Sequence, residues 1–343
     1  MDKIIDLRSD TVTRPGKGML AAMYAAELGD DVYGGDPTVN LLQERTADLL
    51  GFEAGLFVPS GTQSNLIALM AHCERGDEYI VGQEAHAYRF EGGGAAVLGS
   101  IQPQPLNNQA DGSLAIADII AAIKPIDDHF ARTRLLALEN TISGRVLPLD
   151  YLQQATQCAR DHGLSAHLDG ARLCNAAVKL GVSPATVAQG FDSVSLCLSK
   201  GLGAPVGSVL CSSAEFIERA RRWRKMLGGG MRQAGVLAAA GLYALDHHIN
   251  RLSDDHANAA LLAEGLSGIP GITVEAPQTN VVYATIPAER CADLLSWLNK
   301  RGILVRVTPR TRLLTHLDVS RDDILTVVAA ISEFFEREKT YNH

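Results

Sequence analysis

The feature that most constrains the fold of this chain is an alternation of short apolar stretches with longer amphipathic ones, which begins near Glu53. The short stretches predict buried strands and the longer ones predict helices. The expected strands are residues 56–58, 79–81, 96–98, 135–138, 166–168, 194–198 and 208–210, and the expected helices are residues 18–26, 38–50, 63–73, 114–123, 151–161 and 213–226. Strands and helices that alternate in this way predict an α/β domain whose largely parallel sheet is covered on both faces. Ligands bind such sheets beyond the carboxyl ends of the strands.

The pattern changes near Leu245. A long helix over residues 236–266, interrupted near His247 and His248, is expected to lead into a smaller α+β module. Its expected strands are residues 272–274, 280–283, 303–305 and 313–315, with helices over residues 289–300 and 321–336. We therefore predict a large α/β domain over residues 16–245 and a small C-terminal domain over residues 246–343.

The first 15 residues show no periodic spacing of apolar residues, and they end at Pro15. They predict an N-terminal arm, residues 1–15, that lies across a site and takes no part in a core.

Charge and cysteine usage exclude several classes of protein. The net charge of −8 argues against non-specific binding of nucleic acid. No apolar run approaches the ~18 residues of a membrane span, and the N-terminus lacks the apolar stretch of a signal peptide. The six cysteines form no Cys-x-x-Cys pair and the ten histidines show no helical metal-ligand spacing. We therefore expect a cytoplasmic protein without disulfides, metal, nucleic-acid partner or membrane partner.

Lys200 follows the expected strand at residues 194–198 and stands in a stretch of Ser, Gly and Ala. Glycine and other small residues let the backbone turn closely around whatever the lysine holds. Desolvation at such a position lowers the pKa of an amine and makes it a nucleophile toward carbonyl groups. Lys200 is thus a candidate for Schiff-base chemistry, and the alternative is a lysine in a surface loop.

The segment Ser60-Gly61-Thr62 joins an expected strand to an expected helix. Backbone N–H groups at a helix N-terminus, together with the hydroxyls of Ser60 and Thr62, would bind a phosphate. A simple helix N-cap explains the same residues. The segment lacks the lysine of a P-loop and the glycine spacing of a dinucleotide fingerprint, so nucleotide binding is weakly indicated.

Asp169 ends the strand at residues 166–168, and Lys200 follows the next expected strand. Because a helix separates the two strands, both side chains should lie at the same edge of the sheet. A carboxylate that pairs a pyridine nitrogen and a lysine that forms a Schiff base are the groups that pyridoxal 5′-phosphate (PLP) requires. Asp169 could instead be a turn residue or helix cap.

Two further segments fit this interpretation. His86 precedes a run of glycines and could stack on a flat cofactor ring and move protons, although a lone histidine in a loop is usually only a polar residue. Residues 228–230 are three glycines expected to open a helix, so that Arg232 could face a phosphate in its own or a neighbouring subunit. The basic run at residues 219–225 predicts a solvated helix face with one or two ion pairs.

With these residues in hand, the chain resembles the low-specificity L-threonine aldolases, including the L-allo-threonine type. The similarity runs from Ile5 to Leu317, and the residues that match the motifs of that family most closely are 5–13, 30–34, 167–172, 197–207 and 224–233. The resemblance implies the PLP-dependent fold type I of aspartate aminotransferase, with a mostly parallel seven-stranded sheet in the large domain. It also implies dimers of dimers, homotetramers whose active sites lie at the dimer interface.

The resemblance implies a role for each site residue. The catalytic residues would be Lys200, Asp169, His86 and His129. Lys200 would form the Schiff base with PLP, Asp169 would pair the pyridine nitrogen, His86 would stack on the ring, and His86 and His129 would flank the β-hydroxyl of the substrate. The cofactor-binding residues would be Ser60, Gly61, Thr62, His86, Asp169, Arg172, Lys200 and Arg232. The substrate-binding residues would be Ser9, Tyr33, His86, His129, Arg172 and Arg312, with Tyr33 reaching the site from the partner subunit.

One segment departs from the family. Where its members usually read Glu-Asn-Thr-His-Asn, this chain has Ile142 and Ser143 in place of the last two residues. None of the roles above falls on these positions, so we expect the activity to survive with a less certain substrate range.

The implied activity is that of an aldehyde-lyase, which cleaves L-threonine or L-allo-threonine reversibly to glycine and acetaldehyde in threonine catabolism and glycine biosynthesis. A β-eliminating lyase or an aminotransferase on the same scaffold is the alternative within PLP chemistry. A nucleotide-binding or structural α/β protein is the alternative outside it.

Overall fold

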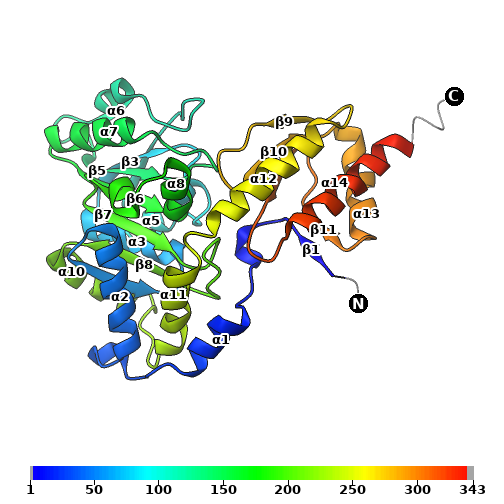
Figure 1. The fold of residues 1–343 in the computed structure, drawn as a ribbon. Coiled ribbons are helices and arrows are strands. Elements are labelled where there is room, and N and C mark those ends of the chain that lie inside the picture. The colour runs from blue at the N-terminus through cyan, green and yellow to red at the C-terminus, as the bar shows by residue number, and fades with distance from the viewer. Residues whose placement is uncertain (1–2, 338–343) are drawn as a thin grey trace. The chain divides into compact units, whose positions relative to one another are not determined.

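The computed structural model describes residues 3–337. The chain forms two compact units, one made by residues 15–249 and the other by the residues up to 14 together with those from 250 onward. The larger unit is the α/β unit and the smaller one is α+β, and Figure 1 shows the elements of each.

A seven-stranded sheet forms the centre of the larger unit, with the strand order β2-β8-β7-β6-β5-β3-β4. Its strands are β2 (Ala54–Val58), β3 (Asp77–Gly82), β4 (Gln102–Leu106), β5 (Arg132–Glu139), β6 (Ser165–Gly170), β7 (Ser193–Cys197) and β8 (Ser208–Ser212). Strand β8 is antiparallel to both of its neighbours, and the other pairs are parallel. Every residue of β3, β7 and β8 is buried, as expected for a sheet covered on both faces. The predicted, mostly parallel seven-stranded sheet is confirmed.

The helices of this unit begin and end close to the apolar periods of the sequence. They are α1 (Lys17–Tyr24), α2 (Pro37–Leu50), α3 (Gly61–His72), α4 (His86–Arg89), α5 (Gly94–Val97), α6 (Ile116–Ala122), α7 (Leu149–Asp161), α8 (Leu173–Leu180), α9 (Pro184–Ala188), α10 (Ala214–Met226) and α11 (Gly235–His247). Helices α3 and α10 pack together over the sheet, where Ile67, Phe216 and Ile217 share one apolar cluster with residues of β2 and β8.

One predicted strand is wrong. Residues 94–97 form the short helix α5, in which Val97 is 75% exposed and therefore is no core strand residue. The strand that lies beside β3 is β4, with the sequence Gln-Pro-Gln-Pro-Leu. Its two prolines are tolerated because β4 is at the edge of the sheet, where one side of the backbone needs no ladder hydrogen bonds.

The smaller unit contains an antiparallel sheet with the order β12-β10-β9. Its elements are β9 (Thr273–Glu275), β10 (Val281–Thr285), β11 (Ile303–Leu304), β12 (Arg310–Leu314), α12 (Leu252–Ser267), α13 (Cys291–Asn299) and α14 (Arg321–Glu336). The interruption predicted near His247 is confirmed, because α11 ends there and α12 begins at Leu252.

The N-terminal segment belongs to the core of the smaller unit. Strand β1 (Ile5–Asp6) pairs in parallel with β11, and Ile5 and Leu7 are buried in the same apolar cluster as α12 and α14. The expectation that this segment stays outside a core is therefore wrong, because Ile5 and Leu7 bury their side chains in the apolar cluster of the smaller unit.

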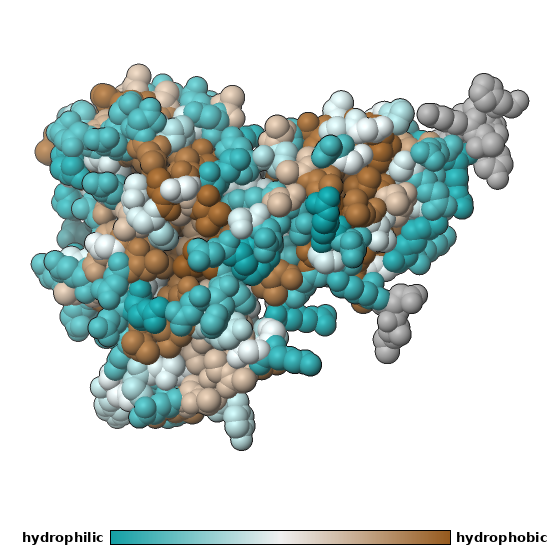
Figure 2. All heavy atoms as spheres, in the orientation of Figure 1, coloured by the Kyte–Doolittle hydropathy of each residue, from teal (hydrophilic) through white to brown (hydrophobic). Residues whose placement is uncertain are grey.

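Polar and charged side chains cover much of the surface that Figure 2 shows, with apolar side chains between them. Within residues 3–337, the structure has no helix of the length and apolarity needed to cross a membrane.

Candidate active site

The carboxyl ends of β5, β6 and β7 bring three ionisable side chains to one edge of the sheet. Glu139 and Asp169, the last charged residues of β5 and β6, are register partners. Lys200 follows the parallel strand β7 by three residues. The prediction that Asp169 and Lys200 share this edge is confirmed, and Glu139 joins them.

Backbone hydrogen bonds hold the turn that carries Lys200. The N–H of Gly203 donates to the carbonyl of Lys200 at 2.8 Å, and the N–H of Ala204 donates to Leu198 at 3.0 Å. Gly203 has φ +77°, a left-handed conformation that suits glycine. The glycines therefore make a tight turn that sets the position of Lys200.

Asp169 is 5% exposed and held on both oxygens. Its Oδ1 accepts from the backbone N–H of Ala171 at 3.0 Å, and its Oδ2 accepts from the Asn65 amide at 2.8 Å. Asn65 is a buried residue of α3 that the sequence analysis missed. Its only sequence signal is its place in the first turns of the helix that follows Ser60.

His86 begins α4 and is held by two carboxylates. Its Nδ1 lies 2.9 Å from Glu91 Oε1, and its backbone N–H donates to Glu139 Oε2 at 2.6 Å. Glu91 also accepts from Asn65 at 2.9 Å. The hydrogen bond that His86 donates to Glu91 raises the pKa of His86, and burial raises the pKa of Glu91. The second ring nitrogen of His86, Nε2, remains to face a ligand.

The possible ligand atoms of His86, Glu91 and Asp169 lie within 4.8 Å of one another. Such a group could also hold a cation. The amide NH₂ of Asn65, however, already donates a hydrogen bond to Glu91 and one to Asp169, so both carboxylates have a donor without a cation.

Burial and the negative charge of Asp169 raise the pKa of Glu139 to about 8. The folded protein therefore keeps a proton that the unfolded chain releases above pH 4.5, so the free energy of unfolding should fall between pH 4.5 and 8. Glu139→Gln mimics the protonated form and removes this fall. The stability of the variant relative to the unaltered protein should thus grow between pH 5 and 8.5, measured by urea unfolding without cofactor.

The exposed Glu218→Gln, in α10, is the matched control and should show no such pH-dependent difference. A Glu139→Gln difference that is equal at both pH values would mean that Glu139 is ionised in the folded protein.

The N-terminus of α3 offers a place for an anion. Ser60 caps the helix, with its Oγ accepting from the N–H of Gln63 at 3.2 Å. The buried hydroxyl of Ser208 has no hydrogen-bond partner among residues 3–337, and a Cβ added to Gly61 would lie 3.5 Å from it. An unsatisfied donor beside the free N–H groups of a helix start suits a phosphate. Like Asn65, Glu91 and Glu139, Ser208 is a residue that the sequence analysis missed.

The prediction that the three glycines at residues 228–230 open a helix is wrong. They follow the end of α10, and α11 begins only at Gly235. Gly229 packs so closely on Gln63 that a Cβ there would lie 1.9 Å from its Oε1. The guanidinium of Arg232 lies 3.5 Å from Asp30 and its side chain is 58% exposed.

The basic helix α10 makes the expected surface ion pairs, but Arg224 is different. It is 3% exposed, lies 2.8 Å from Asp31 and donates to the carbonyl of Phe57 at 2.8 Å. Arg224 therefore ties the loop of Asp31 to strand β2, next to the start of α3.

Two of the remaining predicted site residues, His129 and Tyr33, are largely exposed, whereas Arg172 lies close to the edge of Asp169. His129 lies three residues before β5, at the opposite edge of the sheet from Asp169, and its side chain is 86% exposed. Tyr33 is 85% exposed in the turn η2 (Asp31–Tyr33). Arg172 follows β6 at the N-cap position of α8, two residues from the edge.

Ser9 and Arg312 belong to the smaller unit. Ser9 caps the turn η1 (Asp10–Val12), where its Oγ accepts from the N–H of Thr11, and Arg312 lies in β12. Ile142 is buried, and a Cβ on Gly112 would lie 2.2 Å from its Cγ2. Ile142 therefore packs under a loop, as an apolar side chain does.

The geometry fits PLP. The helix start with Ser208 suits a phosphate, the carboxylate of Asp169 suits a protonated ring nitrogen, and Lys200 suits a carbonyl carbon. All three come from the same edge of one sheet.

Comparison with known proteins agrees with this geometry. Residues 6–289 match the family described as beta-eliminating lyase. The low specificity L-threonine aldolase of Escherichia coli (strain K12) is 54% identical over 334 residues, 97% of this chain and 100% of that protein. Low-specificity L-threonine aldolase 1 of Arabidopsis thaliana is 44% identical over 93% of each chain.

Two solved structures share the fold. Leishmania major threonine aldolase superposes with a TM-score of 0.83 at 22% identity, over 96% of this chain and 99% of that one. Serine palmitoyltransferase of Sphingomonas wittichii gives 0.76 at 18% identity, over 96% and 86%. The predicted PLP-dependent fold type I is confirmed. From the matched residues 6–289 and the 54% identity over nearly its whole length, this chain belongs to the beta-eliminating lyase family and, within it, to the low-specificity L-threonine aldolases.

Proposed function

We propose that this chain is a PLP-dependent aldehyde-lyase that cleaves L-threonine, L-allo-threonine and other β-hydroxy-α-amino acids reversibly to glycine and an aldehyde such as acetaldehyde. The observation that carries the proposal is the 54% identity with a threonine aldolase over 97% of the chain. The shared sheet edge of Asp169 and Lys200 supports it.

Lys200 would hold the cofactor covalently, Asp169 would pair its ring nitrogen, and Ser60, Gly61, Thr62 and Arg232 would hold its phosphate. Bound PLP supplies the electron sink that weakens the Cα–Cβ bond of the substrate. Because Asn65 donates to Asp169 Oδ2 and Ala171 to Oδ1, the carboxylate is fixed in orientation before any cofactor arrives. Arg232 would have to leave Asp30, from which it is 3.5 Å away.

His86 is the base that this arrangement favours. Glu91 Oε1 accepts a hydrogen bond from Asn65. Because a carboxylate oxygen can only accept, it also accepts from His86 Nδ1, which places the hydrogen of a neutral ring on Nδ1. The lone pair of Nε2 is then available to take the proton of the β-hydroxyl. General-base help of this kind contributes ~10²–10⁴ in rate.

His86→Ala should change the ratio of threonine to allo-threonine cleavage, because the imidazole contacts the β-hydroxyl whose configuration distinguishes them. The expected change is a fraction of the ~1–3 kcal/mol that an unpaired buried polar group costs. It is measured as the ratio of kcat/KM for the two substrates. His129→Ala should act on the same ratio, since the family resemblance gives His129 the same hydroxyl.

His129 lies at the opposite edge of the sheet from Asp169, so its effect requires a second copy of the chain. An unchanged ratio in both variants would assign the discrimination to other residues, such as those near Ile142.

Arg312→Lys should raise the KM for L-threonine. Arg172, Arg312 and Ser9 would hold the substrate carboxylate, and lysine keeps the charge but loses the planar fork of arginine. A charge-assisted hydrogen bond contributes ~1.5–3 kcal/mol, which corresponds to a roughly 10- to 150-fold weaker affinity. Titration with glycine, followed by the absorbance of the bound cofactor, measures this affinity directly.

Arg310→Lys in the same strand is the matched control, because Arg310 pairs with Glu275 at 2.7 Å. A glycine affinity that Arg312→Lys leaves unchanged would assign the carboxylate to Arg172 and Ser9. The affinity for PLP should not change in either variant.

We also propose a cytoplasmic homotetramer in which neighbouring subunits complete each site. Tyr33 and His129 are 85% and 86% exposed, so both are available to another copy. Several large apolar side chains are also exposed in the larger unit: Tyr24, Leu28, Phe90, Val97 and Leu98. Figure 2 shows apolar side chains on the visible surface, and burial between subunits would remove such side chains from water.

The test is a product assay on L-threonine, L-allo-threonine and their D-isomers. Equal amounts of glycine and acetaldehyde support the proposal. A β-eliminating lyase, the activity named by the matched family, would release ammonia and a 2-oxo acid instead. An aminotransferase would need an oxo acid to accept the amino group and would release no acetaldehyde, because transamination leaves the Cα–Cβ bond intact.

A further inference from the structure

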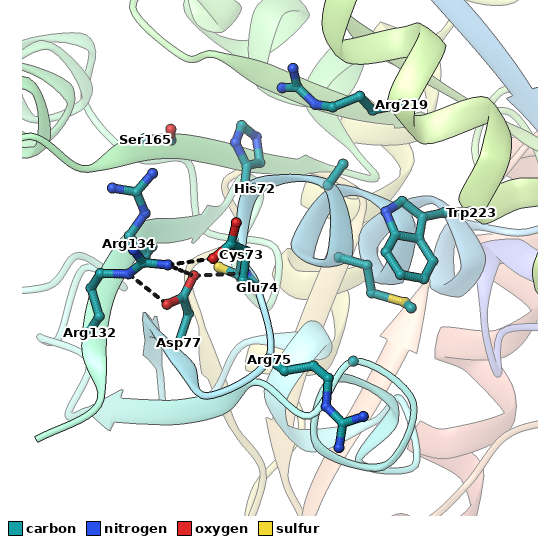
Figure 3. A pocket seen from close by; sticks show the side chains of 13 residues that line it. His72, Cys73, Glu74, Arg75, Asp77, Arg132, Arg134, Ser165, Arg219 and Trp223 are labelled. Atoms are coloured by element: carbon teal, nitrogen blue, oxygen red, sulfur yellow. Dashed lines mark hydrogen bonds and ion pairs between the residues drawn. The ribbon is translucent and has the colours of Figure 1, made fainter.

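A cavity of about 650 Å³ lies at the amino edge of the central sheet, opposite the edge of Asp169 and Lys200. It forms where α3 ends and where β3, β5 and β6 begin, and Figure 3 shows its lining. We call it the arginine pocket, after Arg75, Arg132, Arg134 and Arg219, which line it. Its volume is in the range of small-molecule sites.

The charge of the arginine pocket is opposite to that of the chain. Four arginines line it against the two acids Glu74 and Asp77, whereas the whole chain carries −8. Arg132 is held by both acids, at 2.8 Å from Asp77 and 2.9 Å from Glu74. Among residues 3–337, Arg134 has neither an ion pair nor a hydrogen bond through its side chain. Arg219 pairs with Glu215, which lies outside the pocket, at 2.6 Å. The pocket thus holds positive charge, that of Arg134, which no acid among residues 3–337 neutralises.

His72, the last residue of α3, lies between two of these arginines. Figure 3 shows Arg134 and Arg219 on either side of its ring. Burial, the neighbouring His167 and the two arginines lower the pKa of His72 to about 3. The ring is therefore neutral, and its Nε2 lies 2.7 Å from Ser193 Oγ.

A continuous chain of hydrogen bonds leads from His72 to Asp169. Ser193 Oγ lies 2.8 Å from His167 Nδ1, and His167 Nε2 lies 3.2 Å from Asn65 Oδ1. Asn65 Nδ2 then donates to Asp169 at 2.8 Å. Ser193, His167 and Asn65 are each no more than 3% exposed, so water does not compete with these bonds.

The direction of every bond in this chain follows from its last member. Asn65 must present its NH₂ group to the carboxylates of Glu91 and Asp169, so its Oδ1 accepts from His167 Nε2. Burial lowers the pKa of His167 to about 4, so its ring is neutral and Nδ1 accepts from Ser193. Ser193 in turn accepts from His72. All donors point toward Asp169, and aligned hydrogen bonds polarise one another.

We propose that the arginine pocket binds a small phosphate-bearing anion and that the hydrogen-bond chain from His72 couples its occupancy to Asp169. The planar fork of arginine matches phosphate oxygens in a bidentate geometry, and the free guanidinium of Arg134 supplies it. An anion there also stabilises positive charge on His72 and so strengthens its donation to Ser193. The coupling to PLP rests on the role proposed above for Asp169, whereas the anion site does not.

Pyrophosphate titration tests the anion site. Trp223 lines the pocket, and the one other tryptophan of the sequence is Trp297 in the smaller unit. In a Trp297→Phe background, the fluorescence of Trp223 should change saturably with pyrophosphate, at constant ionic strength set with chloride. The Arg134→Ala/Arg219→Ala double variant should bind at least ~10-fold more weakly, as loss of charge-assisted bonds predicts. Arg222→Ala, an exposed arginine of the same helix outside the pocket, should bind normally.

A fluorescence change that does not saturate, or that the double variant retains, would overturn the anion site. Inorganic phosphate and adenosine monophosphate serve as further probes. Tighter binding of the nucleotide than of either inorganic anion would assign the phosphate to a nucleotide, and equal or weaker binding would assign it to an inorganic anion or another phosphate ester.

The coupling has its own test. Coupling is reciprocal, so PLP should change the pyrophosphate affinity by the same factor by which pyrophosphate changes the PLP affinity, roughly 5-fold or more. Ser193→Ala removes the second link of the chain and should return this factor to 1 while pyrophosphate still binds. His72→Phe should do the same, and thermal unfolding of both variants verifies that they fold.

A factor of 1 in the unaltered protein would overturn the coupling. Because the fluorescence of Trp223 measures pyrophosphate binding with or without PLP, the test of the arginine pocket is independent of the test of the aldolase activity. Pyrophosphate binding without glycine formation would refute only the aldolase, and glycine formation without pyrophosphate binding would refute only the pocket.

Discussion

Lys200→Ala should give a folded protein with no measurable aldolase turnover. The side chain follows β7 at the carboxyl edge of the sheet, and residues 198–207 contain no second lysine that could replace it. Without the covalent link the amino-acid substrate has no Schiff base to exchange with. We expect kcat for acetaldehyde release from L-threonine to fall by at least ~10³-fold, which corresponds to ~4 kcal/mol of activation free energy.

Lys179→Ala is the matched control, because Lys179 is an exposed lysine at the end of α8. It should keep the turnover of the unaltered protein. Thermal unfolding of both variants separates loss of chemistry from loss of fold. Lys200→Ala with normal turnover would end the interpretation of Lys200 as the cofactor lysine, and borohydride reduction followed by peptide mapping would locate the true one.

Asp169→Asn should slow cleavage by roughly 10²- to 10⁴-fold, the range of a positioned proton-transfer group. The amide oxygen can still accept from Asn65, whereas the hydrogen bond from the N–H of Ala171 to Oδ1 is lost. Its NH₂ group would then face the cofactor ring, where a donor cannot keep the ring nitrogen protonated. The cofactor would remain partly bound but would be a weaker electron sink.

The measurement is a comparison of kcat with the PLP dissociation constant. Asp161→Asn, at the end of α7, is the control because its carboxylate accepts only from the exposed Gln157 among the side chains of residues 3–337. If Asp169→Asn kept a normal kcat, the carboxylate would serve the hydrogen-bond network alone. The aldolase would then need another partner for the ring nitrogen.

The sequence was sufficient for most of the strands in the larger unit and for the helices between them. Its apolar stretches are long enough to identify the buried strands β5, β6 and β7, and Glu139, Asp169 and Lys200 stand at or just beyond their carboxyl ends. Because parallel strands end at one edge, Asp169 and Lys200 could be placed together from their positions alone. The periodicity of apolar residues gave a wrong prediction at two places. The apolar Val97 is exposed in a helix, and the proline-rich β4 forms a strand although its sequence is not typical of one.

The partners of the chemical groups could not be found in this way. Asn65, Glu91 and Ser208 stand in a helix, a loop and a strand, and nothing in their own segments distinguishes them from ordinary polar residues. Asn65 reaches Asp169 across 104 positions of the chain. Such contacts depend on how α3 lies over the sheet, which is decided by the packing of many apolar side chains and not by any local signal.

The sequence by itself determined six of the seven strands of the central sheet, its mostly parallel character, and therefore which edge carries Asp169 and Lys200. Only the tertiary structure decided that Asn65 holds Asp169, that His129 lies at the opposite edge, and that Arg134 and Arg219 meet around His72. The physical reason is the range of the forces. Strand and helix patterns are set by neighbours along the chain, whereas a side chain finds its hydrogen-bond partner only after distant segments have packed against each other.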